Sequence, residues 1–304
     1  MSFTAAVLII VSAFMHAGWN YVSKRSSPSL AFFWIAAVSG AMVTSPLLVV
    51  HRRVLGVISA ETWLLILLTG IAQAIYMSGL AGAYKRGDIS LAYPLARALP
   101  VLFIAAISLL LGNGNDIARI SLIGMILIIA GCIILPLRNF RQTRLRDYFG
   151  SVYLMAFIAA LGTTGYTMLD DQALRLLRSN PHVLLSTTNT TLLFIAFQVG
   201  STAIMLGIVT LLYRPERELL QRMLKNRSLV LTGLLTGVVI MATYGLALAA
   251  MAYVTNVSYV AAFRQLSIPI GAMMGLILQG EARYRPKLIG IAIVSIGLIL
   301  VGLG

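Results

Sequence analysis

The sequence is poor in cysteine, histidine and acidic residues. Its single cysteine, Cys132, cannot form a disulfide within the chain, and its three histidines lie far apart. Protein metal centres are usually built from closely spaced cysteine, histidine and acidic ligands, so we expect no metal site. The chain also lacks the Gly-x-x-x-x-Gly-Lys-Ser/Thr loop that binds nucleotide phosphates in many ATPases. We therefore predict no metal, no cofactor and no ATP-driven activity.

Charge is scarce as well, because only 11% of the 304 residues are charged while 59% are hydrophobic. Apolar runs recur from one end of the chain to the other, each about 20 residues long, the length that crosses a hydrocarbon core of about 30 Å. In lipid every backbone polar group must be satisfied internally, and runs this long imply helices rather than barrel strands. The sequence thus predicts an all-α integral membrane protein with several spans.

Ten membrane-spanning segments are predicted, joined by loops too short to form a soluble domain. The longest loops are 138–149, 170–183 and 213–228. The first segment has no charged region before it and is too long for the apolar core of a signal peptide, so we interpret it as a spanning helix. The ten segments cover about 5–23, 30–50, 63–83, 90–111, 120–137, 150–169, 184–212, 229–250, 257–279 and 287–303.

An internal repeat divides the chain into two halves of five helices. Four groups of residues in the first half recur in the same order in the second. Because five is an odd number, the second half must be inverted in the membrane relative to the first. The predicted organisation is a first repeat over 1–137, a basic loop over 138–149 and a second repeat over 150–304. The matching groups are Gly18-Trp19-Asn20 with Gly165-Tyr166-Thr167, Leu68-Thr69-Gly70 with Leu235-Thr236-Gly237, Arg97 with Arg264, and Gly124 and Gly131 with Gly290 and Gly297.

The basic residues indicate an orientation. The net charge of +14 is spread over short loops, which is typical of contact with anionic lipid head groups rather than with nucleic acid. One set of loops contains most of the lysines and arginines, and the positive-inside rule places that set in the cytoplasm and both termini outside. The opposite set contains Arg52, Arg53, Arg119, Arg175 and Arg178.

Two arginines, Arg97 and Arg264, fall inside apolar segments and at corresponding positions of the repeat. A charge at membrane depth is costly and usually faces a bundle interior or a wet cavity. Guanidinium is always charged and binds a carboxylate or phosphate through two parallel hydrogen bonds. The pair therefore predicts a site for a small anionic or carboxylate-bearing substrate; the alternative is that both side chains reach head groups or hold structural carbonyls.

A proline follows each of these arginines. Pro100 cannot donate a hydrogen bond to the carbonyl of Ala96, and Pro269 cannot donate to that of Gln265. We expect a helix kink and a freed carbonyl beside each arginine, as in the discontinuous helices of transporter sites.

Further candidates for substrate binding share faces with these groups. His16, Trp19 and Asn20 lie on one face of the first helix, at positions i, i+3 and i+4. His16 is interpreted either as a substrate contact or proton-coupling group, or as a neutral histidine bonded to a neighbouring helix. Tyr93 lies one turn before Arg97. Two glutamines, which in membrane bundles commonly bridge helices, complete the set: Gln73 and Gln265.

All nine acidic residues are predicted in loops or at helix ends. Asp170 and Asp171 are placed at the end of the sixth span, where they either contact Lys24 and Arg25 at a gate or are simply solvated. An exporter of organic cations generally needs a carboxylate inside the membrane, so this placement disfavours that function.

The chain resembles the EamA branch of the drug/metabolite transporter superfamily. The resemblance rests on the two five-helix halves, on His16-Ala-Gly-Trp-Asn20 before Lys24, and on the run from Gly87 through Asp88-Ile-Ser-Leu-Ala-Tyr-Pro-Leu-Ala to Arg97. It extends over essentially the whole chain. It implies a secondary transporter of small metabolites, often an exporter, with the substrate in a cavity enclosed by the two halves.

The sequence departs from that family in one motif. Many members end the helix after the third loop in Leu-Gly-Glu, whereas the first half here has Leu111-Gly-Asn-Gly114, and only the second half keeps the acid, in Gln279-Gly-Glu281. The resemblance also implies that both termini are cytoplasmic, which is opposite to the orientation that the basic residues indicate.

From these observations we expect a secondary-active transporter, in the exporter direction, in a bacterial inner membrane. Its partners are a small-molecule substrate and the lipid bilayer, and a homodimer is left open. The alternatives are a flippase or a subunit that handles a lipid-linked intermediate, or a membrane-embedded enzyme. The sequence offers no base, nucleophile or metal cluster on one side of the bilayer, so we do not expect an enzyme.

Overall fold

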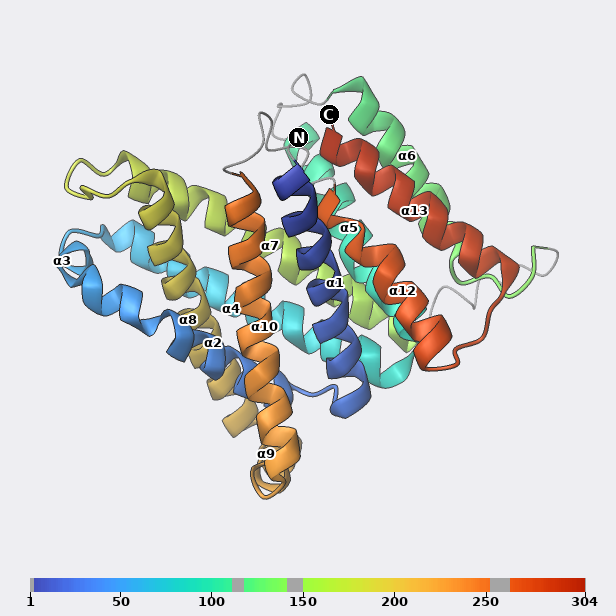
Figure 1. Cartoon of the computed structure of the whole chain (residues 1–304), viewed down its shortest axis with the longest axis horizontal. Coiled ribbons are helices and arrows are strands. Elements are labelled where there is room, and N and C mark those ends of the chain that lie inside the picture. The colour runs from blue at the N-terminus through green and yellow to red at the C-terminus, as the bar shows by residue number, and fades with distance from the viewer. Residues whose placement is uncertain (1–2, 111–117, 141–149, 252–262, 304) are drawn as a thin grey trace. The chain divides into compact units, whose positions relative to one another are not determined.

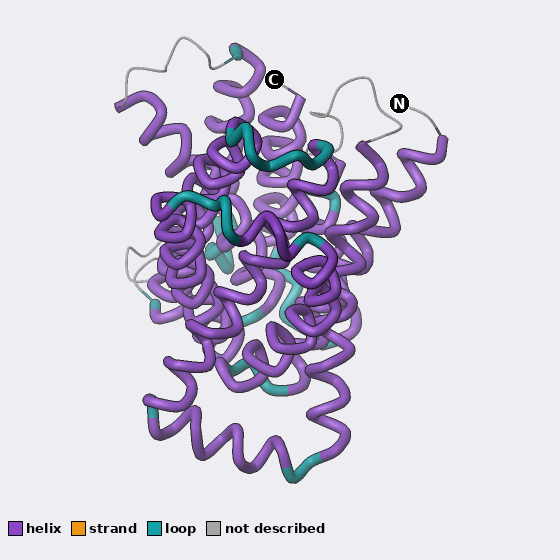
Figure 2. Tube along the Cα trace, turned by 90° about the vertical axis from the view of Figure 1, so that its left-hand side faces the viewer, coloured by secondary structure: helices purple, strands orange, loops and turns teal. Residues whose placement is uncertain are grey.

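The computed structural model describes residues 3–110, 118–140, 150–251 and 263–303 (Figure 1). Within these ranges the regular structure is entirely helical and the helices are joined by short loops (Figure 2). Eight of the described helices are long and apolar enough to cross a membrane. The prediction of an all-α, multi-pass membrane protein is therefore confirmed.

The eight long helices coincide with eight of the predicted spans. They are α1 (Phe3–Ser26), α2 (Leu30–Val50), α4 (Ala60–Arg86), α5 (Ile89–Leu110), α7 (Ser151–Ser179), α8 (Thr187–Leu212), α10 (Arg227–Met251) and α13 (Arg285–Leu303). Two shorter apolar helices, α6 (Arg119–Ile134) and α12 (Ser267–Leu278), lie within the other two predicted spans. Two further helices, α3 (Arg52–Leu55) and α9 (Arg214–Leu224), lie in predicted loops.

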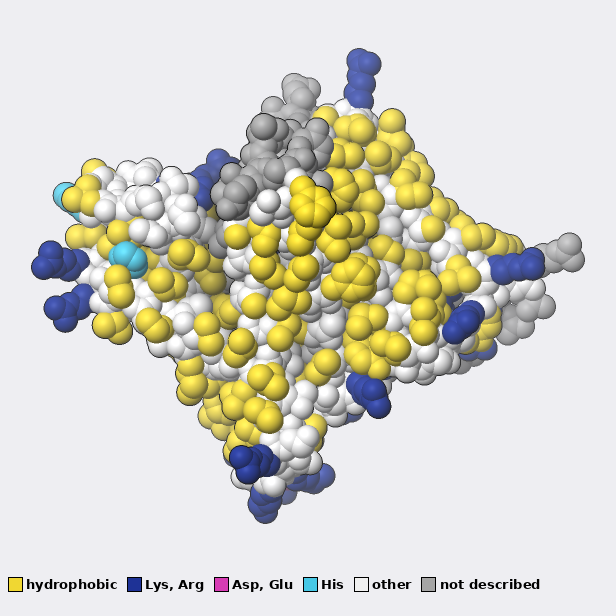
Figure 3. Space-filling view, viewed as in Figure 1, with side chains coloured by type: hydrophobic (Ala, Val, Ile, Leu, Met, Phe, Trp, Pro, Cys, Tyr) yellow, Lys and Arg dark blue, Asp and Glu magenta, His cyan; other side chains and the backbone are white. Residues whose placement is uncertain are grey.

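Large apolar side chains cover much of the surface. Leu212, Leu184 and Val50 are among those that are more than two-thirds exposed. Hydrophobic side chains spread over the faces of the helices, while lysines and arginines gather toward their ends, for example around α3 and α9 (Figure 3). A surface of this kind suits contact with lipid acyl chains, bordered by polar head groups.

The predicted loop 170–183 is wrong, because α7 continues as a helix to Ser179. Hydropathy falls at Asp170 and Asp171, yet the following turns are stabilised by an Asp171–Arg175 ion pair of 2.8 Å and by the burial of Ala173 and Leu177. Hydropathy therefore predicted the end of the apolar run and not the end of the helix, which hydrogen bonding and packing stabilise as far as Ser179.

The predicted loop 213–228 contains the amphipathic helix α9. Pro215 lies in its first turn, where a missing N–H costs little, and Leu220 and Met223 are buried. Glu216 accepts a hydrogen bond of 3.0 Å from the backbone N–H of Ala31, in the first turn of α2. The helix therefore places a carboxylate at the positive end of α2, a favourable position for negative charge.

Contacts between Cα atoms divide the chain into two compact units. Unit 1 consists of residues 1–25, 79–160 and 239–304, and unit 2 of residues 26–78 and 161–238. Each unit combines segments from both predicted repeats, and α4, α7 and α10 each contribute one part to each unit.

In unit 1, α6 packs against α13 and α5 packs against α12. Glycines allow the closest approach: a Cβ atom on Gly124 would lie 2.6 Å from the carbonyl oxygen of Gly297, and one on Gly297 would lie 2.6 Å from that of Gly124. Gly131 likewise faces the carbonyl oxygen of Gly290, at 3.1 Å. The proposed repeat equates Gly124 with Gly290 and Gly131 with Gly297, so it makes these two contacts counterparts of each other.

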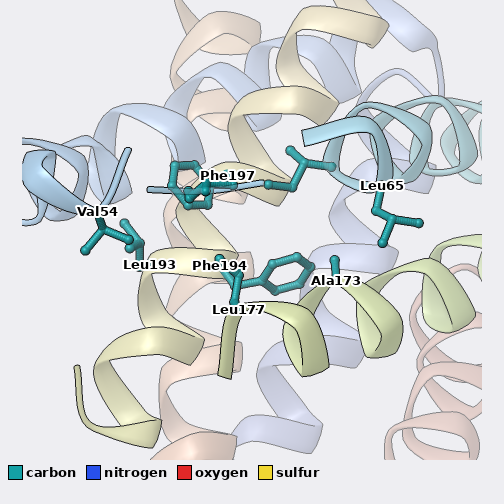
Figure 4. Close-up of a cluster of buried hydrophobic side chains, with 9 residues drawn as sticks. Val54, Leu65, Ala173, Leu177, Leu193, Phe194 and Phe197 are labelled. Atoms are coloured by element: carbon teal, nitrogen blue, oxygen red, sulfur yellow. The ribbon is translucent and has the colours of Figure 1, made fainter. Parts of the chain in front are cut away.

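In unit 2, α2 packs against α8 and α9. Gly237 of α10 lies against the backbone of Ala36, and Gly70 of α4 lies against Ser201. At one end of the unit nine buried apolar residues from α3, α4, α7, α8 and the segment after α3 form what we call the apolar cluster (Figure 4). Its members are Val54, Ile58, Leu65, Ile66, Ala173, Leu177, Leu193, Phe194 and Phe197.

Candidate functional site

Helix α5, which carries Arg97, is fixed at its N-terminus by two carboxylates. Glu281 accepts hydrogen bonds from the backbone N–H groups of Ile89 and Ser90, at 2.6 and 3.0 Å. Asp88, just before the helix, forms an ion pair of 2.8 Å with Lys287 of α13, whose side chain is buried. Negative charge at a helix N-terminus is favourable, and both carboxylates tie α5 to segments distant in sequence. Glu281, the acidic residue of the motif that only the second repeat retains, thus orients α5, the helix that carries Arg97.

Replacing Glu281 with alanine is expected to lower the free energy of unfolding by about 1–3 kcal/mol, because two backbone N–H groups lose a charged acceptor. The melting temperature of purified protein in detergent measures the change. Glu218→Ala is the matched control, since Glu218 forms an exposed ion pair with Arg214 on α9, and such pairs contribute little. Equal melting temperatures for the two variants would contradict the role given to Glu281.

The chain around Arg264 is interrupted as a helix. Phe263 and Arg264 are helical, Gln265 and Leu266 form a turn, and α12 begins at Ser267. The predicted break therefore lies beside Arg264, but its expected cause is wrong. The carbonyl of Gln265 is not freed by Pro269, because it accepts a hydrogen bond of 2.9 Å from the N–H of Ile268.

Neither proline ends a helix. Pro269 lies in the first turn of α12, where the first N–H groups have no partner within the helix. Helix α5 continues through Pro94 and Pro100 to Leu110. The discontinuity is therefore limited, in the described part of the chain, to the segment that carries Arg264.

The two predicted arginines belong to one neighbourhood in unit 1. Arg97 donates a long hydrogen bond of 3.5 Å to the side-chain oxygen of Gln265. The guanidinium of Arg264 lies over the ring of Tyr244, 5.4 Å from its centroid, in a cation–π contact. The rings of His16 and Tyr93 lie near each other, with their centroids 6.2 Å apart. The structure thus brings together Arg97, Arg264, Gln265, Tyr93 and His16.

Tyr93 connects α5 to α12. Its hydroxyl donates a hydrogen bond of 3.0 Å to the hydroxyl of Ser267, and its side chain is only 1% exposed. The ring fits because Gly271 has no side chain: a Cβ atom there would lie 2.6 Å from the ring. Tyr93 therefore sets the spacing between α5, which carries Arg97, and α12, which begins three residues after Arg264.

His16 offers a buried hydrogen-bond donor. The indole N–H of Trp19 donates to its Nδ1 at 3.2 Å, and an indole nitrogen can only donate. Nδ1 is therefore an acceptor, which places the imidazole hydrogen on Nε2. That nitrogen is buried and has no hydrogen-bond partner among the residues described. An oxygen atom of a ligand would satisfy it.

Asn20 is fully occupied within the protein. It is completely buried, its amide donates to the carbonyl of His16 at 2.8 Å, and its oxygen accepts from the hydroxyl of Tyr84 at 2.7 Å. Lys24 donates to the carbonyls of Tyr84 and, at 2.6 Å, of Gly87. These bonds join α1, which carries His16, to the end of α4.

Unit 2 contains Gln73, the remaining predicted substrate-binding residue, and Asp170, whose position the sequence analysis predicted wrongly. Gln73 is buried in the part of α4 that belongs to unit 2. Asp170 lies inside α7 and not at its end, so the prediction that acids occur only in loops or at helix ends is wrong. Its two carboxylate oxygens accept hydrogen bonds from the hydroxyl of Thr69 and from the amide of Gln198.

No family model matches the chain, and no curated protein matches it. One solved structure, described as "Crystal structure of protein", superposes with a TM-score of 0.57 at 17% sequence identity. The alignment covers 100% of this chain and 98% of that one. The fold is therefore shared over the full length. At this identity the similarity concerns the fold alone.

Proposed function

We propose that the protein is a secondary-active transporter that moves a small organic anion, such as a carboxylate-bearing metabolite, by alternating access. The observation behind this proposal is the meeting of Arg97 and Arg264 in one compact unit, with the unpartnered Nε2–H of His16 beside them. All three groups donate hydrogen bonds, and two of them are cationic. The complementary ligand has oxygen acceptors and a negative charge.

Energetics favour a ligand over a purely structural role. Two like charges in apolar segments repel each other and are costly to remove from water. Arg97 donates a long hydrogen bond to Gln265, and Arg264 contacts the ring of Tyr244. A bound carboxylate would reduce the repulsion between the two positive charges.

The predicted ten-helix architecture and the resemblance to the EamA family are consistent with this function. Segments matched by the repeat pack in pairs, α5 with α12 and α6 with α13, as expected around a pseudo-twofold axis. The break beside Arg264 is a further feature of transporter sites, where interrupted helices line the substrate path. We propose that the protein belongs to this family and works as a metabolite exporter in a bacterial inner membrane.

A thermal-stability screen tests the proposal. Purified protein in detergent is heated in the presence of carboxylates, phosphate esters, amino acids and quaternary ammonium compounds, each in large excess. A ligand present at a hundredfold its Kd stabilises the folded state by about 2.7 kcal/mol. We expect organic anions or amino acids to raise the melting temperature. Stabilisation by lipids alone would instead favour a flippase.

A second candidate function, export of organic cations, is favoured by Asp170. The argument against it depended on the absence of acids inside spanning helices, and Asp170 lies inside α7. Stabilisation by quaternary ammonium compounds that is lost in Asp170→Asn would support this second function.

A further inference from the structure

Asp170 occupies a built polar site where three helices of unit 2 meet. Thr69 of α4 donates to one carboxylate oxygen and Gln198 of α8 donates to the other. Thr69 is fully buried and Gln198 is 7% exposed. The adjacent Asp171 differs in its exposure and in its partner, because its side chain is 61% exposed and forms an ion pair with Arg175. One of two consecutive acids is thus held inside the helix packing, and the other is solvated.

The apolar cluster separates Asp170 from the nearest helix ends. Ala173 and Leu177 follow Asp170 on α7, Leu65 and Ile66 precede Thr69 on α4, and Phe194 and Phe197 precede Gln198 on α8 (Figure 4). The cluster therefore lies between the polar site and one end of each helix, namely the C-terminus of α7 and the N-termini of α4 and α8.

Few charged groups surround this carboxylate. Helix α8 contains no acidic or basic residue and no histidine. On α4 the nearest acid, Glu61, is exposed and more than two turns before Thr69. Within unit 2 the titratable groups of α4 are Glu61 and Tyr76, and those of α7 besides Asp170 are Tyr166, Asp171, Arg175 and Arg178. Tyr76 and Tyr166 contact each other edge to face, with their ring centroids 5.8 Å apart. No basic side chain forms an ion pair with Asp170 in the part of unit 2 that the structure describes.

We propose that Asp170, with Thr69 and Gln198, binds an exchangeable monovalent cation, a proton or Na⁺, that couples to transport. The carboxylate supplies the negative charge, and the threonine hydroxyl supplies a further oxygen. Gln198 can turn its amide oxygen toward the site by rotating the end of its side chain. Coupling rests on the proposed function, whereas cation binding does not.

Uptake of a proton changes the hydrogen bonds at the site. A proton from solution adds to one carboxylate oxygen, which then becomes a donor and needs an acceptor. The side-chain amide of Gln198 supplies this acceptor when it rotates so that its oxygen, instead of its N–H, faces the carboxyl group. Because Gln198 belongs to α8 and Asp170 to α7, occupancy of the site alters the bond between these helices. That bond provides a route from cation binding to helix movement.

Infrared difference spectroscopy tests the proton. Spectra of purified protein in lipid are compared between pH 5 and pH 8, without any substrate. The wild type is expected to show a carboxylic-acid C=O band that is absent from Asp170→Asn and retained in Asp171→Asn. Sodium is tested separately, by melting curves in NaCl against choline chloride at equal ionic strength. Stabilisation by NaCl is expected to disappear in Asp170→Asn alone.

A response in either arm supports the proposal and identifies the cation. Wild-type behaviour of Asp170→Asn in both arms overturns it. If Asp170→Asn does not fold, Thr69→Val preserves side-chain size and removes one hydrogen bond to the charged carboxylate. For a proton, we then expect half-saturation at about a tenfold lower concentration, because the charged carboxylate has lost a hydrogen bond. For Na⁺, we expect half-saturation at about a tenfold higher concentration, because a ligand oxygen has been lost. Because these measurements need no substrate, their failure is distinct from failure of the transport proposal.

Discussion

Glutamine in place of Arg97 or Arg264 is expected to abolish stabilisation by the anion found in the screen, and to abolish its flux in proteoliposomes. Each replacement removes a charged fork that can make two hydrogen bonds to a carboxylate or phosphate. Hydrogen bonds to charged groups contribute about 1.5–3 kcal/mol each. Loss of two of them therefore weakens binding by about a hundredfold or more.

Both variants are expected to remain folded. Glutamine is neutral and of similar reach, so it lowers the cost of burial at this position. Arg25→Gln is the matched control, because Arg25 belongs to the same unit, is exposed and donates a hydrogen bond of 3.3 Å to the hydroxyl of Tyr21. A lysine at position 97 would keep the charge and lose the fork, and so an intermediate affinity is expected.

Size-exclusion profiles and melting temperatures without ligand establish that the variants are folded, and isotope counterflow measures transport. Wild-type flux in both glutamine variants would refute the proposed site. Loss of flux together with loss of the folded peak would show that the arginines are structural, which is the alternative that their snorkelling chemistry allows.

The neighbourhood of Arg97 could be predicted from the sequence for a physical reason. A charge in an apolar run has few tolerable environments, so two arginines at repeat-related positions are expected to share one. Helical spacing predicted that Tyr93 shares a face with Arg97, whereas the contact of Arg97 with Gln265 and that of Tyr93 with His16 depend on how the helices pack. The positions of the eight long helices were likewise predicted from the apolar runs that match the thickness of the bilayer, although α7 extends beyond its run.

Contacts between distant residues could not be predicted in this way. Asp170 looks like the end of a span because hydropathy treats it alone, whereas its environment is made by Thr69 and Gln198 on other helices. Glu281 similarly caps a helix that begins nearly 200 residues earlier. Ser267 has no sequence signal, since its partnership with Tyr93 depends on how α5 meets α12. Only the packing supplies these pairs.

A leucine at Gly297 is expected to have the largest effect on stability. Helices α6 and α13 cross where Gly297 and Gly124 face each other, and even a Cβ atom on either would lie 2.6 Å from the other's carbonyl oxygen. The obstacle is backbone, which cannot move aside as a flexible side chain could. Forcing the helices apart is expected to cost about 3 kcal/mol or more, in a bundle held by close packing.

Gly245→Leu is the control for this change, because Gly245 is exposed and, among the described residues outside its own helical turn, no atom lies within 4 Å of a Cβ atom placed there. Melting temperature and the fraction of monodisperse protein compare the variants. Gly124→Leu should resemble Gly297→Leu, and the double variant should lose much less than the sum. Once the helices are separated, the second side chain meets little further resistance. Additive losses would mean that the two glycines act independently.

The crossing also bears on the arginine site, because α13 carries Lys287, whose ion pair holds Asp88 at the start of α5. Displacement of α13 is therefore expected to loosen the anchoring of Arg97 and to weaken ligand binding beyond the loss of stability itself. Surviving Gly297→Leu protein, measured at a temperature where it is folded, should bind the anion more weakly than Gly245→Leu. Equal affinity would show that Glu281 alone suffices to hold α5 in place.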